Sequence, residues 1–315
     1  MKNDMSLPKV TFALFSYNHE MYISNAVKGA LEQSYENLEI IISDDNSTDS
    51  TFNIVEELVN NYEGPHDVRV QKNETNMGIG AHVSKVVNQA SGDFIVLAAG
   101  DDISLPERAV RSVEILLANP KAVSVCLSAD IIDSKGAITG EKKLVPSIFR
   151  LHCNRFGSKK QLLSDLLSGN AITFGAGRTV RKSVFSTFGD LNPDCPTEDT
   201  PLMLRSLMLG ESVLSNEKKV LYRIHGSNAS SSSSMQKINM RMIFEQYRQD
   251  ILVAASKGIV NENDLRRLNV WVNNERQVRD IKIAMQQKRR LKLNEKIFTI
   301  RSSRFNFVEK VKSLL

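Results

Sequence analysis

Short segments rich in β-branched residues alternate with helical patterns over the first 130 residues, and this alternation strongly limits the possible folds. Strands separated by helices of about 10–15 residues form βαβ units, which build a mainly parallel sheet covered by helices on both faces. We therefore predict an α/β fold that binds ligands beyond the carboxyl ends of its strands. The predicted strands are 10–15, 38–43, 68–71, 94–98 and 122–127, and the predicted helices are 22–33, 50–61, 81–89 and 106–119.

The pattern changes after residue 128. Residues 128–194 are less regular and rich in glycine, which indicates an insert rather than further βα units. The polar run 227–234 (SNASSSSS) is a predicted linker, and helical periodicity returns at 238–256 and 265–285. We predict a first domain at 1–230 and a basic helical extension at 235–315.

Charge is unevenly distributed between these two parts. Residues 235–315 contain 18 Lys or Arg and 8 Asp or Glu, a net charge of +10, whereas the whole chain carries only +5. Nucleic-acid binding is not favoured, because the basic run 288–293 lacks interleaved aromatic residues and Trp271 is the only tryptophan. An anionic membrane surface suits the run better, and a solvated helical tail is the alternative. The residues that could face lipid are Leu291, Leu293, Ile297, Phe298 and Ile300.

Three features predict a cytoplasmic location. No apolar run approaches the ~18–20 residues that a membrane-spanning helix needs, and residues 1–8 lack the apolar core of a secretion signal. Cys126, Cys153 and Cys195 are odd in number and far apart, which argues against a disulfide framework or a zinc site.

Acidic residues follow two of the predicted strands. Asp45, directly after strand 38–43, could accept hydrogen bonds from a nucleobase N–H or from ribose hydroxyls, although residues 44–49 could also only turn and cap the next helix. Asp101 and Asp102 follow strand 94–98. Mg²⁺ and Mn²⁺ prefer a few carboxylates plus phosphate oxygens, so this pair could hold such an ion, or could simply form a turn.

Two further groups lie later in the chain. Asp199, preceded by Glu198, begins an apolar-periodic helix, where it could be a capping residue or a general base. Arg223 and His225 follow the apolar pair Val220-Leu221. They could donate to diphosphate oxygens, and His225 could also bind a metal, although a histidine near a surface turn is often unremarkable.

In this order, these groups resemble the family 2 glycosyltransferases with the GT-A fold, over about residues 8–230. The motifs are Ser16-Tyr17-Asn18, Gln33-Ser34-Tyr35, residues 39–42 leading into 44–49, Asn76-Met77-Gly78, residues 90–93 leading to Gly100-Asp101-Asp102 and Pro106, Glu198-Asp199 with Arg205, and residues 222–225 with Asn228 and Ser230. The family often has Asp-x-Asp-Asp at its metal motif. Here Ala99 stands at the first position, so one carboxylate is missing.

The resemblance implies a role for each residue. Tyr17 would stack on the nucleobase, with Ser16 beside it, and Asp45 would bind the base N–H. Asp101 would be the main ligand of Mn²⁺ or Mg²⁺, Asp102 would touch the metal or the donor sugar, and Arg223 and His225 would face the diphosphate, with His225 a possible metal ligand. Asp199 would be the catalytic base of an inverting transfer, and Glu198 would position the acceptor.

The implied reaction moves a sugar from a nucleoside diphosphate donor, with a UDP-sugar favoured, to a saccharide acceptor. Such acceptors are often lipid-linked, in the synthesis of capsule, O-antigen or other bacterial surface polysaccharides, so the enzyme would work at the inner face of the membrane. The insert would set the acceptor. A catalytically inactive sugar-nucleotide-binding module and a nucleotidyltransferase remain alternatives. Dinucleotide and P-loop sites are not favoured, because Gly78 and Gly80 lack a third glycine and a following lysine.

Overall fold

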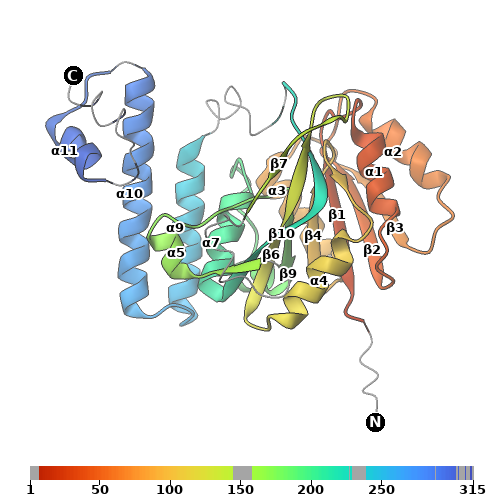
Figure 1. The fold of residues 1–315 in the computed structure, drawn as a ribbon, viewed down its shortest axis with the longest axis horizontal. Coiled ribbons are helices and arrows are strands. Elements are labelled where there is room, and N and C mark those ends of the chain that lie inside the picture. The colour runs from red at the N-terminus through yellow and green to blue at the C-terminus, as the bar shows by residue number, and fades with distance from the viewer. Residues whose placement is uncertain are drawn as a thin grey trace, which may run out of the picture.

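The computed structural model describes residues 7–144, 158–226, 228, 239–287, 289–302, 304, 309 and 313. Its first part follows the predicted alternation closely (Figure 1). The elements are β1 Val10–Ser16, α1 Ile23–Leu31, β2 Leu38–Asp44, α2 Thr51–Asn60, β3 Asp67–Lys72, α3 Gly78–Gln89, β4 Phe94–Ala99, β5 Ile103–Ser104, α4 Arg108–Ala118 and β6 Ala122–Ile132.

The second part contains more regular structure than the sequence indicated. The predicted insert forms β7 Ile138–Lys142, β8 Ser158–Gln161, α5 Leu163–Leu167, β9 Arg178–Arg181 and α6 Ser183–Phe188. The remaining elements are α7 Asp199–Leu209, β10 Glu211–Arg223, α9 Met240–Ser256, α10 Glu262–Gln286 and α11 Leu293–Arg301. Of the predicted linker, only Asn228 lies among the described residues. Ser230 of the motif and Cys153 lie outside them.

One sheet organises the molecule, with the strand order β3-β2-β1-β4-β9-β6-β10-β5. The pairs among β3, β2, β1 and β4 are parallel, as is the long pair of β6 with β10. The short strand β9 lies antiparallel between β4 and β6. The predicted α/β fold is therefore confirmed, with an antiparallel strand in its centre.

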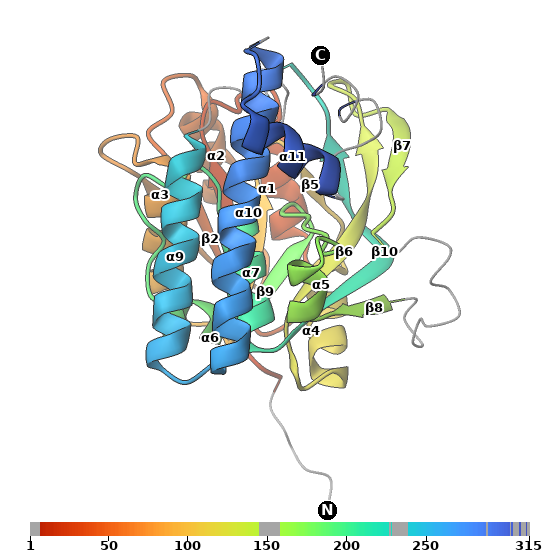
Figure 2. The ribbon, with the colours of Figure 1, turned by 90° about the vertical axis from the view of Figure 1, so that its left-hand side faces the viewer.

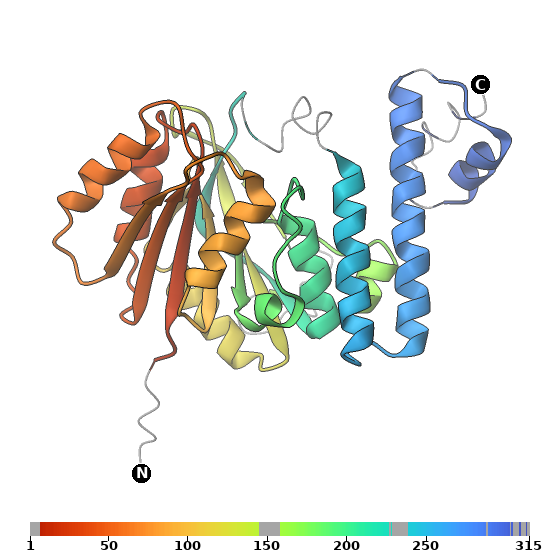
Figure 3. The ribbon, with the colours of Figure 1, turned by 180° about the vertical axis from the view of Figure 1, so that it is seen from behind.

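Helices cover both faces of this sheet, because alternate residues of each strand point to opposite faces. Phe12 and Ile40 pack on one side, under α1, α2 and α4. Ala13 and Ile41 pack on the other side, against α3, α6 and α7. Figures 1 and 3 show these two layers from opposite directions.

The C-terminal helices form an additional layer beyond α7 (Figure 2). Apolar residues of α9 and α10, among them Phe244 and Trp271, share a core with Leu204 and Leu207 of α7. Inside this interface Arg205 of α7 forms a fully buried ion pair with Asp250 of α9, at 2.9 Å. No helix in the described part of the chain is long and apolar enough to cross a membrane.

The residues proposed to face lipid divide into two groups. Leu291 and Phe298 pack against Ile281 and its neighbours on α10, so these two face the protein. Leu293, Ile297 and Ile300 are exposed. The sequence pattern alone could not separate the groups, because α11 uses part of its apolar surface to attach to α10.

A buried carboxylate ties β2 to the loop before β4. Glu39 is 1% exposed, and it accepts hydrogen bonds from Thr11 and from Ser91 N and Oγ, both at 2.6 Å. Burial alone would raise its pKa, but the hydrogen bonds from Ser91 and Thr11 lower the pKa of Glu39 to about 2.

We predict that Glu39→Gln lowers the free energy of unfolding by about 2 kcal/mol at pH 7. A carboxyl whose pKa is lower in the folded state stabilises the fold above its unfolded pKa, and this stabilisation is lost as the pH falls from about 4.5 to about 2. Urea denaturation measures the free energy of unfolding of the variant and of the natural protein. The difference between the two should be smaller at pH 3 than at pH 7. The exposed Glu36→Gln variant is the control, and an equal loss at both pH values would contradict the prediction.

Candidate functional site

The predicted residues meet at the carboxyl edge of the sheet. Ser16, the last residue of β1, pairs with Asp44 of β2, and Phe15 pairs with Ala99 of β4, so the three strands end at the same level. The end of β10 reaches this edge as well. Arg223 N donates to Asp102 Oδ1 at 2.9 Å, and Arg223 Nε donates to the carbonyl of Asp101 at 2.9 Å.

Asp44 and Asp45 have different surroundings at the end of β2. Asp44 accepts hydrogen bonds from Ser16 Oγ at 3.0 Å and from Ser47 N at 2.7 Å, so it fixes the local turn. Asp45 is also buried, but its carboxylate holds the segment before α3. Its Oδ1 accepts from Asn73 Nδ2 at 2.7 Å and Met77 N at 2.8 Å, and its Oδ2 accepts from Gly78 N at 2.9 Å.

These contacts leave limited capacity for a ligand on Asp45. A carboxylate offers about four acceptor positions, and the described residues fill three of them, which leaves one position on Oδ2. Tyr17 follows Ser16 and is 44% exposed, so its ring is accessible to a ligand. The end of β2 and the residue after β1 therefore present a carboxylate oxygen and an aromatic ring at the same edge.

A second cluster surrounds Asp101. Its Oδ2 lies 3.1 Å from His225 Nε2 and 3.3 Å from Asn228 Nδ2. Asp102 is 5% exposed, and burial and the neighbouring charge of Asp101 raise its pKa well above the ordinary range. Arg223 points its guanidinium into the protein, where Nη1 donates to the carbonyl of Asp133 at 3.0 Å. Its positive charge therefore lies on the interior side of the two aspartates.

The side chains of this cluster fit a divalent cation that takes its remaining coordinating atoms from a bound substrate. Asp101 and His225 offer one carboxylate oxygen and one imidazole nitrogen side by side. Across the described residues there is no group of three or more His, Cys, Asp and Glu side chains that could hold a metal. A cation here would need oxygens from another source, and a diphosphate supplies them.

His19 is a residue of this site that the sequence motifs did not single out. Its Nδ1 is buried without a hydrogen-bond partner in the described part of the chain. A Cβ at Gly100 would lie 2.7 Å from this nitrogen, so the glycine is needed where the chain passes the imidazole. Burial lowers the pKa of His19, which is opposed by the charge of Asp101.

Glu198 and Asp199 form a separate group at the beginning of α7. Glu198 occupies the N-cap position, yet its side chain makes no capping hydrogen bond. Asp199 Oδ1 is buried with no hydrogen-bond partner among the described residues. Helix capping therefore does not account for this pair. Gly175 leaves the space for the carboxylate, because a Cβ there would lie 1.7 Å from Asp199 Oδ1.

Arg178 is linked to this pair through Thr173, and no sequence pattern predicted it because it lies in the irregular segment. Arg178 is 1% exposed, and its Nη2 donates to Thr173 Oγ1 at 2.5 Å. Thr173 Oγ1 in turn donates to the carbonyl of Asp199 at 3.4 Å. Burial and the charge of Asp199 raise the pKa of Glu198 to about 8, and the charge of Arg178 opposes this rise. Glu198 is therefore largely protonated at neutral pH.

We predict that replacing Glu198 changes the pH dependence of stability. A carboxyl whose pKa is higher in the folded state costs stability as the pH rises from about 4.5 to about 8. Glu198→Gln removes this cost, so its free energy of unfolding relative to the natural protein should rise by about 1–3 kcal/mol between pH 5 and pH 8. Urea denaturation at both pH values measures the change. The exposed Glu57→Gln variant should show none, and an equal difference at both pH values would contradict the raised pKa.

Comparisons with known proteins show which family this chain resembles. The model of the family described as glycosyl transferase family 2 matches residues 11–189. An uncharacterized glycosyltransferase of Nostoc sp. is 27% identical over 264 residues, which cover 79% of this chain and 77% of that protein. The protein EpsE of Bacillus subtilis is 34% identical over 109 residues, but the match spans only 35% of this chain and 38% of EpsE.

Two solved structures share the fold. TarS of S. aureus (residues 1–349), in complex with UDP-GlcNAc, has a TM-score of 0.64 at 17% identity, covering 93% of this chain and 81% of that chain. The mannosyltransferase PcManGT from Pyrobaculum calidifontis, in complex with GDP-Man and Mn²⁺, has a TM-score of 0.56 at 14% identity, covering 98% and 88%. These similarities confirm the predicted GT-A architecture.

Proposed function

The chain belongs to glycosyl transferase family 2, and from this membership we propose that it moves a sugar from a nucleoside diphosphate sugar to a saccharide acceptor with inversion. The observation that most supports this proposal is the arrangement of its acidic residues. Asp45 and Asp101–Asp102 meet at one edge of the sheet. Asp199 lies at the start of α7, and its buried Oδ1 has no hydrogen-bond partner among the described residues. The family match removes the main reason for considering a nucleotidyltransferase.

The strand edge binds the donor in this proposal. Tyr17 stacks on the nucleobase, and the unused acceptor position of Asp45 receives a base N–H, while Ser16 fixes the turn through Asp44. A UDP-sugar is the favoured donor, since TarS was crystallised with UDP-GlcNAc, although PcManGT was crystallised with GDP-Man. Arg223 contributes positive charge from behind Asp101.

Mn²⁺ or Mg²⁺, held by Asp101 and His225 with Asp102 beside it, would neutralise the diphosphate charge when bound. Asp199 takes the proton of an acceptor hydroxyl, and Glu198 positions that hydroxyl as a neutral hydrogen-bond donor. The hydroxyl oxygen then forms a bond to the anomeric carbon as the bond from that carbon to the diphosphate oxygen breaks. The leaving nucleoside diphosphate keeps the electron pair.

A lipid-linked acceptor in bacterial surface-polysaccharide synthesis is part of the proposal. The basic extension, with the exposed Leu293, Ile297 and Ile300, supports peripheral contact with the inner face of a membrane. A catalytically inactive sugar-nucleotide-binding module is the remaining alternative, and turnover of a sugar nucleotide distinguishes the two.

We predict that Asp199→Asn lowers transfer or donor turnover by about 100-fold or more, because the acceptor hydroxyl loses its base. Affinity for the nucleoside diphosphate should change less than about twofold, since Asp199 is not among the residues proposed to bind the nucleotide. Radiolabelled sugar transfer and calorimetric titration measure these quantities. Asp194→Asn removes an exposed carboxylate nearby and serves as the control.

Gly175→Ala provides a second variant for the same prediction. It keeps the carboxylate of Asp199 but places a methyl group where that carboxylate lies, so activity should fall while the nucleotide still binds. Gly140→Ala, whose added methyl group would find its nearest neighbour at 3.8 Å, is the matched control. Full activity of Asp199→Asn would exclude Asp199 as the base.

We predict that Asp101→Ala weakens nucleotide binding in Mn²⁺ by about tenfold or more and leaves binding in chelator unchanged. The reason is that the carboxylate beside His225 is the main protein ligand proposed for the cation. Calorimetric titration with UDP and GDP, each with Mn²⁺ and with EDTA, tests this. Equal binding by the natural protein under both conditions would contradict the ligand role.

A further inference from the structure

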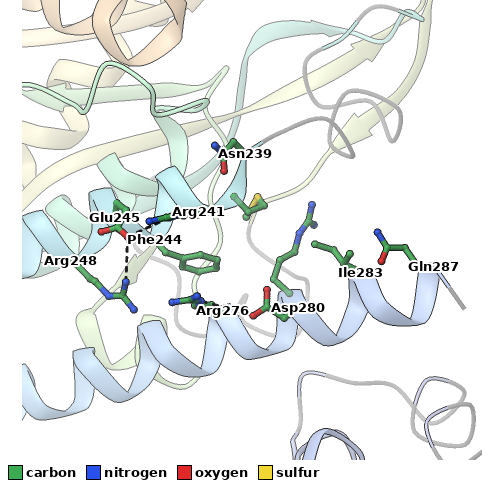
Figure 4. Close-up of a pocket in the computed structure, with 11 residues that line it drawn as sticks. Asn239, Arg241, Phe244, Glu245, Arg248, Arg276, Asp280, Ile283 and Gln287 are labelled. Carbon is green, nitrogen blue, oxygen red and sulfur yellow. Dashed lines mark ion pairs between the residues drawn. The ribbon is translucent and has the colours of Figure 1, made fainter. Parts of the chain in front are cut away.

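A recess separates the first half of α9 from the second half of α10. It has a volume of about 580 Å³, which lies within the range of small-molecule sites. Phe244 of α9 and Ile283 of α10 contribute its apolar part, and Phe244 is only 6% exposed (Figure 4). We call this recess the α9–α10 groove.

Positive charge dominates the groove. Arg241 and Arg248 enter it from α9, and Arg276 and Arg279 enter it from α10. Glu245 and Asp280 are the acidic residues that line it. Four arginines and two carboxylates leave two net positive charges in a space that two helices share. Like charges brought together from two elements repel each other, and an anion between them would relieve this repulsion.

Three of these arginines are only loosely paired. Arg248 lies 3.6 Å from Glu245, Arg241 lies 4.0 Å from the same carboxylate, and Arg276 lies 4.0 Å from Asp280. Every one of these pairs lies within a single helix, and the distances exceed that of a hydrogen bond. Figure 4 shows Arg248 and Phe244 extending from α9 toward α10. The guanidinium groups of Arg241, Arg248 and Arg276 therefore retain N–H donors for a ligand.

The groove also lies at a suitable end of the molecule. Figures 1 and 3 show that α9 begins and α10 ends at the level where the strands of the sheet end. That level holds the cluster of Asp45, Asp101 and His225. A ligand in the groove could therefore extend toward the candidate catalytic residues.

We propose that the α9–α10 groove binds phosphate groups of the acceptor. The planar guanidinium fork of arginine matches phosphate oxygens, and two phosphodiester groups or one diphosphate diester would carry about two negative charges. The apolar floor formed by Phe244 and Ile283 accommodates an uncharged part of the same molecule. A recess between two helices fits a single acceptor chain better than it fits the flat surface of a membrane. The assignment to the acceptor rests on the proposed function, whereas phosphate binding by the groove does not.

Inorganic pyrophosphate is the probe for the first test, titrated calorimetrically into the full-length chain in EDTA so that no metal-dependent site contributes. We expect saturable binding that weakens about tenfold in Arg248→Gln and in Arg276→Gln. These side chains are 37% and 54% exposed, so the variants should fold normally. Arg266→Gln is the matched control, because Arg266 is an exposed arginine of α10 outside the groove, and its variant should bind as the natural protein does.

Two results would overturn the proposal directly. One is that pyrophosphate does not bind. The other is an equal loss of pyrophosphate affinity in all three variants, which would indicate only a general attraction to a basic surface. Loss of binding to phosphatidylglycerol vesicles in Arg248→Gln and Arg276→Gln, without any pyrophosphate binding, would instead identify a membrane surface. A parallel loss of UDP affinity in these variants would show that the probe occupies the donor site. UDP binding by the natural protein tests the proposed function separately.

Discussion

The hydrogen bonds of Arg223 hold together the edge of the sheet where the candidate site lies. Its backbone N–H binds the Asp102 carboxylate, Nε binds the carbonyl of Asp101, and Nη1 binds the carbonyl of Asp133. One side chain thus connects the ends of β4, β6 and β10. Burial raises the pKa of Asp102 and so favours its neutral form, and the hydrogen bond from Arg223 N satisfies one oxygen of this buried carboxyl. The position of Asp101 beside His225 depends on this connection.

Buried arginines perform the same task elsewhere in the fold. Among the residues that the structure describes, Arg108, Arg178, Arg205 and Arg223 are the largest fully buried side chains. Arg108 binds the carbonyl of Leu97 in β4, and Arg205 binds the carbonyls of Gly189 and Asp190. The guanidinium groups of Arg108, Arg205 and Arg223 satisfy backbone oxygens where β9 and the irregular segments interrupt regular pairing, whereas Arg178 donates to the hydroxyl of Thr173. Five N–H donors in a rigid fork suit this task better than the single ammonium of lysine.

The sequence predicted the parts of the structure that depend on local pattern. Strands such as Leu38–Asp44 are buried throughout and rich in isoleucine, and the residues that follow them reach one edge because parallel strands end together. The antiparallel strand Arg178–Arg181 has only four residues and no periodicity, so nothing in the sequence placed it inside the sheet. Arg178 and Gly175 were missed for the same reason, since their proximity to Asp199 arises only from tertiary packing. Likewise, only the contact with α10 divides the apolar residues of α11 into buried and exposed groups.

Helix α7 connects the candidate catalytic base to the C-terminal helices. It begins at Asp199, and six residues later Arg205 binds Asp250 in the middle of α9. Burial of these two charges is costly unless they stay paired. Helices α7 and α9 therefore cannot shift past each other without breaking this ion pair. Burial raises the pKa of Asp250 and the charge of Arg205 opposes that rise, as expected for a pair removed from water. The first half of α9 forms one wall of the α9–α10 groove. A phosphate held in that groove would therefore lie at a fixed distance from Asp199, and the length of the acceptor between the two would decide which hydroxyl reaches the base.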